Sequence, residues 1–140
     1  HGDSSMVAMS QITFMGKPLA QLQQEKPQIF GKVTYDILLE RTHQLGMEIV
    51  IGKGSTEFGI GAALAMVCKA VLHDEKRILP VSALLEGEYG QNGIMAGVPA
   101  IIGKGGVEEI IELSLNEQEQ KAFAASCDVI RAYIAKANAR

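Results

Sequence analysis

An apolar stretch at residues 56–72 constrains the fold of this chain more than any other feature. A helix through it would carry large apolar side chains nearly all round, namely Phe58, Ile60, Leu64, Met66, Val67 and Val71. Such a helix belongs inside a protein or between two domains or subunits. Ser55 or Thr56 can cap it, and Glu57 suits the positive end of its dipole. We therefore expect a capped helix from about Thr56 to Leu72, buried in a core or in an interface.

Three other segments show helical patterns. A short helix is predicted over residues 18–25, and a long one follows from Pro27 to about Ile51. Gly31 weakens the long helix without breaking it, and the paired glycines of Gly52-Lys53-Gly54 end it. A final helix is predicted after an Asn116 cap, with one apolar face made of Phe123, Cys127, Ile130, Ile134 and Ala137.

Four segments are predicted to be strands. Residues 6–14 alternate loosely between apolar and polar side chains, as a half-buried strand does. Residues 78–85, 94–102 and 107–115 are rich in β-branched residues, and Asn92-Gly93 is the strongest hairpin signal in the chain. These last three runs predict an antiparallel meander. Because strands and helices do not alternate regularly, the fold class is predicted to be α+β.

Charge and hydropathy exclude several classes of partner. The 13 basic and 16 acidic side chains are scattered and give a net charge of −3, which disfavours nucleic acid and anionic membranes. The apolar runs stop short of about 18 residues, the length that a membrane span requires. With 140 residues, 47% of them hydrophobic, one soluble cytoplasmic domain is expected over residues 1–140. No Cys, His, Asp and Glu cluster has metal-ligand spacing, so no metal is predicted.

His1 is the residue best suited to chemistry, because an imidazole with a pKa of about 6.5 can accept and return a proton near neutral pH. It is followed by Gly2, Asp3 and two serines, which allow close approach and can orient the ring. A histidine at a chain start beside glycine and serine also has a second interpretation, a remnant of an expression tag.

Four motifs in a fixed order extend the interpretation beyond His1. They are His-Gly-Asp-Ser-Ser at 1–5, Lys-Gly-Ser-Thr-x-Phe-Gly-Ile at 53–60, Tyr89-Gly90, and Gly-Val-Pro-Ala at 97–100. In this order they resemble the carboxyl-terminal half of the lactate and malate dehydrogenase family, nearly from end to end of the chain. The resemblance implies long helices, twisted antiparallel sheet and a C-terminal helix. It also implies that an amino-terminal Rossmann domain lies outside this chain. The 140 residues themselves contain no G-x-G-x-x-G fingerprint of dinucleotide binding.

The resemblance implies an NAD-dependent L-2-hydroxyacid dehydrogenase of the L-lactate type, which converts lactate and NAD to pyruvate and NADH. It implies that His1 is the proton donor and acceptor, that Thr56, Leu45 and Gly46 lie at the substrate, and that Ile60 lies against the nicotinamide. The family's aspartate partner of the histidine and its carboxylate-binding arginine precede the histidine, and so lie outside this chain. Family members are commonly dimers or tetramers, so the resemblance implies a homo-oligomer, with a homotetramer expected. It also implies a role in glycolysis and fermentation.

The residues leave alternatives open for several of these roles. For Thr56 the alternative is a role as helix cap alone, and for Leu45 and Gly46 it is a core-facing place on a long helix. Asp3, two residues from His1, can be mistaken for its aspartate partner. A malate dehydrogenase is an alternative, although the run after His-Gly-Asp is closer to the lactate type. An alternative from another class is a non-catalytic α+β assembly module. The 140-residue chain by itself is expected to show no turnover.

Overall fold

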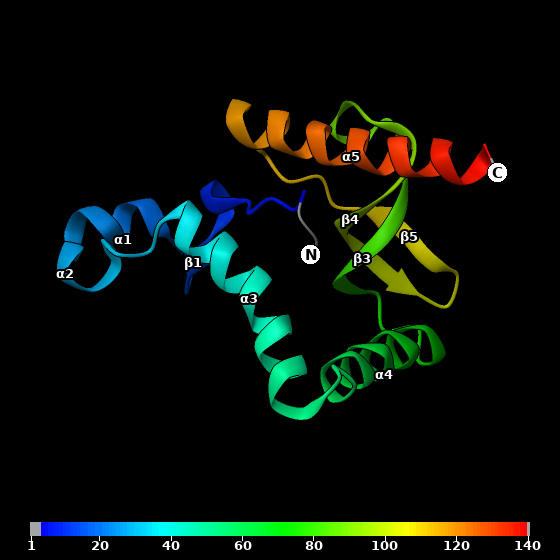
Figure 1. Ribbon diagram of the computed structural model, residues 1–140, viewed down its shortest axis with the longest axis horizontal. Helices are drawn as coiled ribbons and strands as arrows, with labels where there is room; N and C mark the ends of the chain where they lie inside the picture. Colours follow the sequence, from blue (N-terminus) through cyan, green and yellow to red (C-terminus); the bar gives the residue numbers. More distant parts are fainter. Residues whose placement is uncertain (1–3, 140) are drawn as a thin grey trace. The chain divides into compact units, whose positions relative to one another are not determined.

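The structure is a computed structural model of the chain and describes residues 4–139. Two compact units make it up. The first joins the described residues up to Glu48 with those from Ser114 onward, and the second is Ile49–Leu113. Figure 1 follows the elements along the chain. That the 140 residues act as one substrate-binding domain stays a prediction.

The first unit is mainly helical. Its elements are η1 (Met9–Gln11), β1 (Thr13–Phe14), β2 (Lys17–Pro18), α1 (Leu19–Glu25), α2 (Pro27–Phe30), most of α3 (Tyr35–Lys53) and α5 (Glu117–Asn138). The short helix predicted over 18–25 is confirmed as α1. The interior includes Leu19 from α1, Phe123 and Cys127 from α5, and Leu115 just before α5.

The strand predicted over residues 6–14 is wrong apart from its last two residues. Met9–Gln11 form a turn of 3-10 helix, and the antiparallel pair of β1 with β2 starts only at Thr13. The amide of Ser10 is hydrogen-bonded to a side chain of α5 rather than to a neighbouring strand. A period of two identifies a strand only when a partner strand takes its backbone hydrogen bonds.

The long helix predicted from Pro27 is broken after Phe30, so the prediction that Gly31 does not interrupt it is wrong. A β-carbon at Gly31 would lie 2.5 Å from the carbonyl oxygen of Pro27, which only glycine avoids. The Thr34 hydroxyl then accepts a hydrogen bond from the Ile37 amide at 3.3 Å and starts α3. The predicted end is confirmed, because α3 stops at Lys53 and Gly54 has a φ of +89°.

Helix α5 begins at the predicted cap. The Asn116 side chain accepts from the Glu119 amide at 3.0 Å, and the Glu119 carboxylate accepts from the Asn116 amide at 3.0 Å. This capping box satisfies two backbone donors of the first turn. The predicted apolar face is buried only in its first half, at Phe123 and Cys127, whereas Ile134 is 46% exposed.

The second unit is an antiparallel meander with one long helix. It contains α4 (Phe58–Leu72), β3 (Arg77–Glu86), η2 (Glu88–Gly90), β4 (Asn92–Gly103) and β5 (Gly106–Ile110), with strand order β3-β4-β5. The predicted meander is therefore confirmed, although β5 ends five residues before the predicted Leu115. Buried side chains alternate along β3 and β4, namely Leu79, Ala83, Leu85, Ile94, Ala96, Val98, Ala100 and Ile102. Of these, Leu79, Ala100 and Ile102 pack with Ala70 as one core cluster of this unit.

The hairpin between β3 and β4 turns earlier than Asn92-Gly93. Its tip is the 3-10 turn η2, where Tyr89 has a φ of 52°. Asn92 already pairs with Glu86, and a bulge follows at Gly93, whose φ is +65°. The hydroxyl of Tyr89 accepts from the Leu113 amide at 2.9 Å, which holds the tip. Burial raises the pKa of Tyr89, so this hydroxyl keeps its proton at neutral pH.

Helix α4 is apolar as expected, but most of it is not covered within this chain. Only Ala70 is buried, packed with Leu79, Ala100 and Ile102. Phe58, Leu64 and Leu72 are 79%, 62% and 82% exposed. The sequence predicted that α4 is buried either in a core or in an interface. Burial in a core of this chain is wrong for these three side chains, and burial in an interface stays a prediction.

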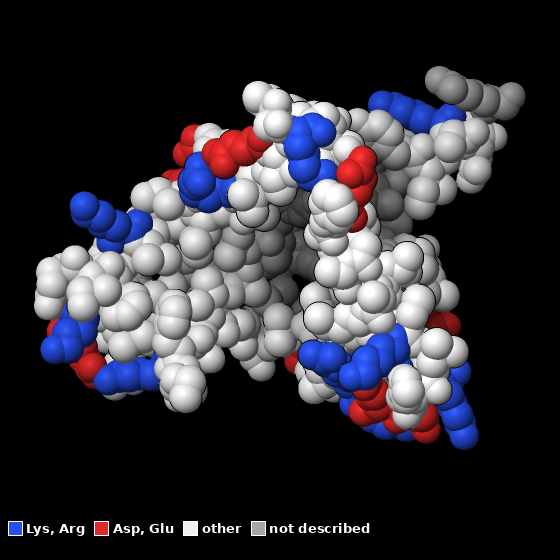
Figure 2. All heavy atoms as spheres, turned by 90° about the horizontal axis from the view of Figure 1, so that it is seen from below, with Lys and Arg blue, Asp and Glu red and all other residues white. Residues whose placement is uncertain are grey.

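Charges of both signs are mixed on the face shown in Figure 2. Several charged side chains of the protein form ion pairs, such as Arg41 with Glu48 at 2.8 Å and Arg131 with Asp128 at 2.9 Å. Within residues 4–139, no single helix is long and apolar enough to cross a membrane, and only the bent pair Pro27–Lys53 and Phe58–Leu72 meets that test together. The same residues hold no group of three His, Cys, Asp or Glu side chains that suits a metal ion.

Candidate functional site

The predicted catalytic residue, His1, lies outside the described residues. The segment that follows it is described from Ser4 and is held to two helices of the first unit. The hydroxyl oxygens of Ser4 and Ser126 on α5 lie 3.3 Å apart, and the Ser5 hydroxyl lies 2.7 Å from Nε2 of His43 on α3. Both serines are half-buried. Ser4 and Ser5 are therefore tied to α5 and α3 by side-chain hydrogen bonds.

Thr56 and Ile60 lie at the start of α4, in the second unit. The prediction that Ser55 or Thr56 caps this helix is wrong, because the N-cap is Glu57 and no side chain makes a capping hydrogen bond. The Ser55 hydroxyl donates to the Glu57 carboxylate instead, which together with Lys53 lowers the pKa of Glu57. Thr56 is exposed and its hydroxyl bonds to no described residue, and Ile60 is 67% exposed.

Leu45 and Gly46 lie next to one another on α3, in the first unit. No residue of α3 is buried within the chain. Leu45 is 53% exposed, and a β-carbon added to Gly46 would meet no atom within 4 Å. The alternative that these two residues face a core of this chain is therefore wrong. Both positions present surface that residues outside the chain, or a ligand, can contact.

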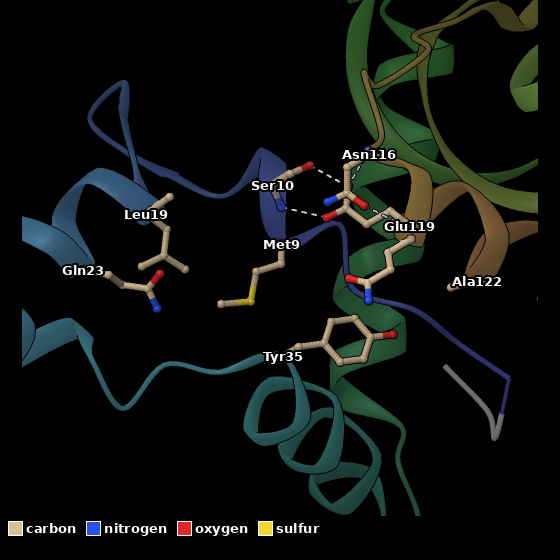
Figure 3. A pocket seen from close by; sticks show the side chains of 10 residues that line it. Met9, Ser10, Leu19, Gln23, Tyr35, Asn116, Glu119 and Ala122 are labelled. Atoms are coloured by element: carbon tan, nitrogen blue, oxygen red, sulfur yellow. Dashed lines mark hydrogen bonds between the residues drawn. The ribbon is translucent and has the colours of Figure 1, made fainter.

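A pocket of about 630 Å³ lies in the first unit, and its walls come from η1, α1, the start of α3 and the start of α5. Figure 3 shows Met9, Leu19 and Gln23 on one side of it and Asn116, Glu119 and Ala122 on the other, with Tyr35 below. Of the predicted site residues that the structure describes, namely Leu45, Gly46, Thr56 and Ile60, none lines this pocket. The sequence pattern gave no sign of it, because its walls join residues as far apart along the chain as Met9 and Ala122.

Glu119 is the charged group at the wall of this pocket, and it is only 4% exposed. One carboxylate oxygen accepts from the Ser10 amide at 2.8 Å, and the other from the Ser10 hydroxyl at 2.5 Å and the Asn116 amide at 3.0 Å. Burial alone would raise the pKa of Glu119, but these hydrogen bonds outweigh it and lower the pKa below its usual value. Glu119 is therefore an ionised carboxylate at neutral pH that ties the segment after His1 to α5.

Comparison with known proteins defines the class to which this fold belongs. The family model of the lactate/malate dehydrogenase alpha/beta C-terminal domain matches residues 1–140. The chain belongs to the lactate/malate dehydrogenase family, as its carboxyl-terminal domain. The resemblance stated from the four motifs and the α+β fold class are both confirmed.

Individual relatives include lactate dehydrogenases and a malate dehydrogenase. The chain is 46% identical over 134 residues to L-lactate dehydrogenase 3 of Bacillus cereus, a match that covers 96% of this chain and 42% of the relative. A crystal structure of minor L-lactate dehydrogenase from Enterococcus mundtii superposes with a TM-score of 0.85 at 38% identity, covering 94% of this chain and 42% of that one. A malate dehydrogenase from Salinibacter ruber gives 0.84 at 35% identity, covering 99% and 43%. The chain thus spans less than half the length of these relatives.

Proposed function

We propose that the complete protein is an NAD-dependent L-2-hydroxyacid dehydrogenase that interconverts L-lactate and pyruvate. The 46% identity to an L-lactate dehydrogenase over 134 residues carries this proposal. Because the match covers only 42% of that relative, the activity belongs to a longer protein. Residues 1–140 supply its substrate-binding and catalytic domain, and a Rossmann domain ahead of His1 supplies most of the dinucleotide site.

His1 moves the proton of the reaction. In the direction of oxidation, the hydroxyl proton of lactate passes to an imidazole nitrogen of His1. The hydrogen on the carbon that bears this hydroxyl group leaves as a hydride. NAD supplies the acceptor for that hydride, a role that no side chain can fill. In the reverse direction His1 returns its proton to the carbonyl oxygen of pyruvate, which a group with a pKa of about 6.5 does readily near neutral pH.

Ile60 fits a place against the nicotinamide ring of NAD. It lies in the first turn of α4, and two thirds of its side chain is uncovered within this chain. A flat ring is bound well by a branched aliphatic side chain on one face. Ile60 therefore supplies an apolar contact, and the residues that bind the remainder of NAD belong to the Rossmann domain outside the chain.

Thr56 and the pair Leu45-Gly46 contact the substrate. Thr56 is suited to this role because its hydroxyl is exposed and is not engaged in capping α4. Leu45 is half exposed on α3. As part of the wall of the substrate pocket, its bulk would influence which 2-hydroxyacids fit. Gly46 adds no side chain beside it. The homo-oligomer expected from the resemblance stays a prediction, with which the exposed apolar side chains of α4 are compatible.

The proposed substrate is tested by comparing L-lactate and L-malate as substrates of the complete protein, with NADH formation followed by absorbance. We expect kcat/KM to be higher for lactate, because the chain is more similar to the lactate dehydrogenase than to the malate dehydrogenase. A higher value for malate would assign the protein to the other branch of the family. Turnover of neither substrate would favour the non-catalytic assembly module.

The role of Thr56 is tested by Thr56→Val, which keeps the shape of the side chain and removes its hydroxyl. A hydrogen bond contributes about 0.5–1.5 kcal/mol net, so its loss is expected to lower kcat/KM for lactate roughly 2–10-fold. The matched control is Thr13→Val on the exposed strand β1, which should keep kcat/KM unchanged. If both variants keep the full value, Thr56 does not contact the substrate.

A further inference from the structure

Helix α5 holds the segment 4–11 at two points on one face. Near its start, Glu119 accepts hydrogen bonds from the amide and the hydroxyl of Ser10. Seven residues further on, the Ser126 hydroxyl lies 3.3 Å from the Ser4 hydroxyl. Seven residues make two turns at about 3.6 residues per turn, so both contacts lie on the same side of the helix. The first half of α5 therefore holds both ends of the segment that follows His1.

The contact at Ser126 acts closest to the chemistry. Ser4 is three residues along the chain from His1, whereas Ser10 is nine residues away. Ser126 lies in a well-packed stretch of α5, because Phe123 before it and Cys127 after it are buried, at 8% and 1% exposure. The hydroxyl contact is itself partly buried, which shields it from competing water.

We propose that Ser126 is a positioning residue that acts on His1 through Ser4. By fixing the Ser4 hydroxyl against a rigid helix, Ser126 restricts the backbone that carries the imidazole and keeps it aligned with the substrate hydroxyl. This inference rests on the proposed role of His1. Proton transfer tolerates little misplacement, since an error of about 1 Å can cost roughly 100-fold in rate. A single remote hydrogen bond controls only part of that alignment.

The test is made in the complete enzyme with Ser126→Ala and Ser126→Thr. Ser126→Ala is expected to lower kcat for lactate about 3–10-fold, with KM for lactate and the Kd for NADH changed less than about twofold. Ser126→Thr keeps a hydroxyl and should restore most of the rate. The matched control, Ser82→Ala, removes an exposed hydroxyl from β3 and should leave kcat unchanged. A merely structural role would lower thermal stability without separating kcat from KM.

A double-mutant cycle shows whether Ser126 acts through Ser4. If the two hydroxyls work as one contact, Ser4→Ala, Ser126→Ala and the double variant should lower kcat by similar factors. Factors that multiply would overturn the inference, as would full kcat in Ser126→Ala or no recovery in Ser126→Thr. Should Ser126→Ala fail to fold, Ser4→Ala leaves α5 intact, and its retention of full kcat would overturn the inference as well.

Failure of this inference can be told apart from failure of the proposed function. If His1→Gln is inactive while Ser126→Ala keeps full kcat, His1 is catalytic but Ser126 does not position it. If His1→Gln itself keeps full kcat, the proposed function of His1 is wrong, whatever Ser126 does.

Discussion

His1→Gln is expected to lower kcat of the complete protein by about 10²–10⁴-fold, the usual contribution of a general acid–base group. Glutamine is polar and similar in size to histidine, but its amide neither accepts nor releases a proton near neutral pH. NADH binding should be nearly unchanged, because most of the dinucleotide site is proposed to lie outside this chain. Turnover is measured by NADH absorbance and NADH affinity by fluorescence titration.

The matched control is His73→Gln, at the exposed C-cap of α4. It makes the same chemical change and should keep kcat within about twofold of the unchanged protein. Full turnover by His1→Gln would remove His1 from the mechanism and return it to the alternative of a tag remnant. A variant that loses both turnover and NADH binding would point to misfolding, which circular dichroism detects.

Leu85→Ala is expected to have the largest effect on stability in the second unit. Leu85 on β3 is 0% exposed and lies opposite Ile94 of β4, which is 2% exposed. Removing its side chain leaves a cavity in the sheet core, and buried leucine-to-alanine changes usually lower the free energy of unfolding by about 2–5 kcal/mol. The loss is measured by urea unfolding of the 140-residue chain.

The neighbouring residue supplies the control. Leu84 points to the opposite face of β3 and is 49% exposed, so Leu84→Ala makes the same change where little packing is lost. Its effect should be below about 1 kcal/mol. Equal losses at the two positions would contradict the register of β3 against β4, because a shift of one residue exchanges the two faces of a strand.

Burial of α4 was only partly predictable. The composition of residues 56–72 correctly predicted an apolar helix. Because apolar area in water is unfavourable, a cover over that helix is expected. It did not specify which atoms provide that cover. The structure places Ala70 against the sheet and leaves Phe58 and Leu64 exposed within this chain. The interface alternative stated from the sequence is the one that remains.

The candidate site came from motifs rather than from physical patterns. His1, Thr56, Leu45, Gly46 and Ile60 were assigned by family resemblance, because single polar or small residues have no periodicity that marks them as functional. The structure adds the local facts that bear on four of them. Thr56 does not cap α4, Ile60 and Leu45 are exposed, and Gly46 lies in no core of this chain. Their roles stay predictions.

The sequence by itself determined the features that depend on neighbouring residues. The Asn116 cap, the end of α3 at Gly54 and the alternation along β3 and β4 are set within a few positions, where local hydrogen bonding and burial period decide the conformation.

Only the tertiary structure decided which distant segments meet. The backbone donor of Ser10 could have joined a strand, but Glu119 accepts it across 109 positions, and Ser4 meets Ser126 across 122. Such pairings depend on how whole helices pack, and no local preference of either residue encodes them. That is why residues 6–12 were wrongly predicted as part of a strand, and why the attachment of Ser4 and Ser10 to α5 became visible only in three dimensions.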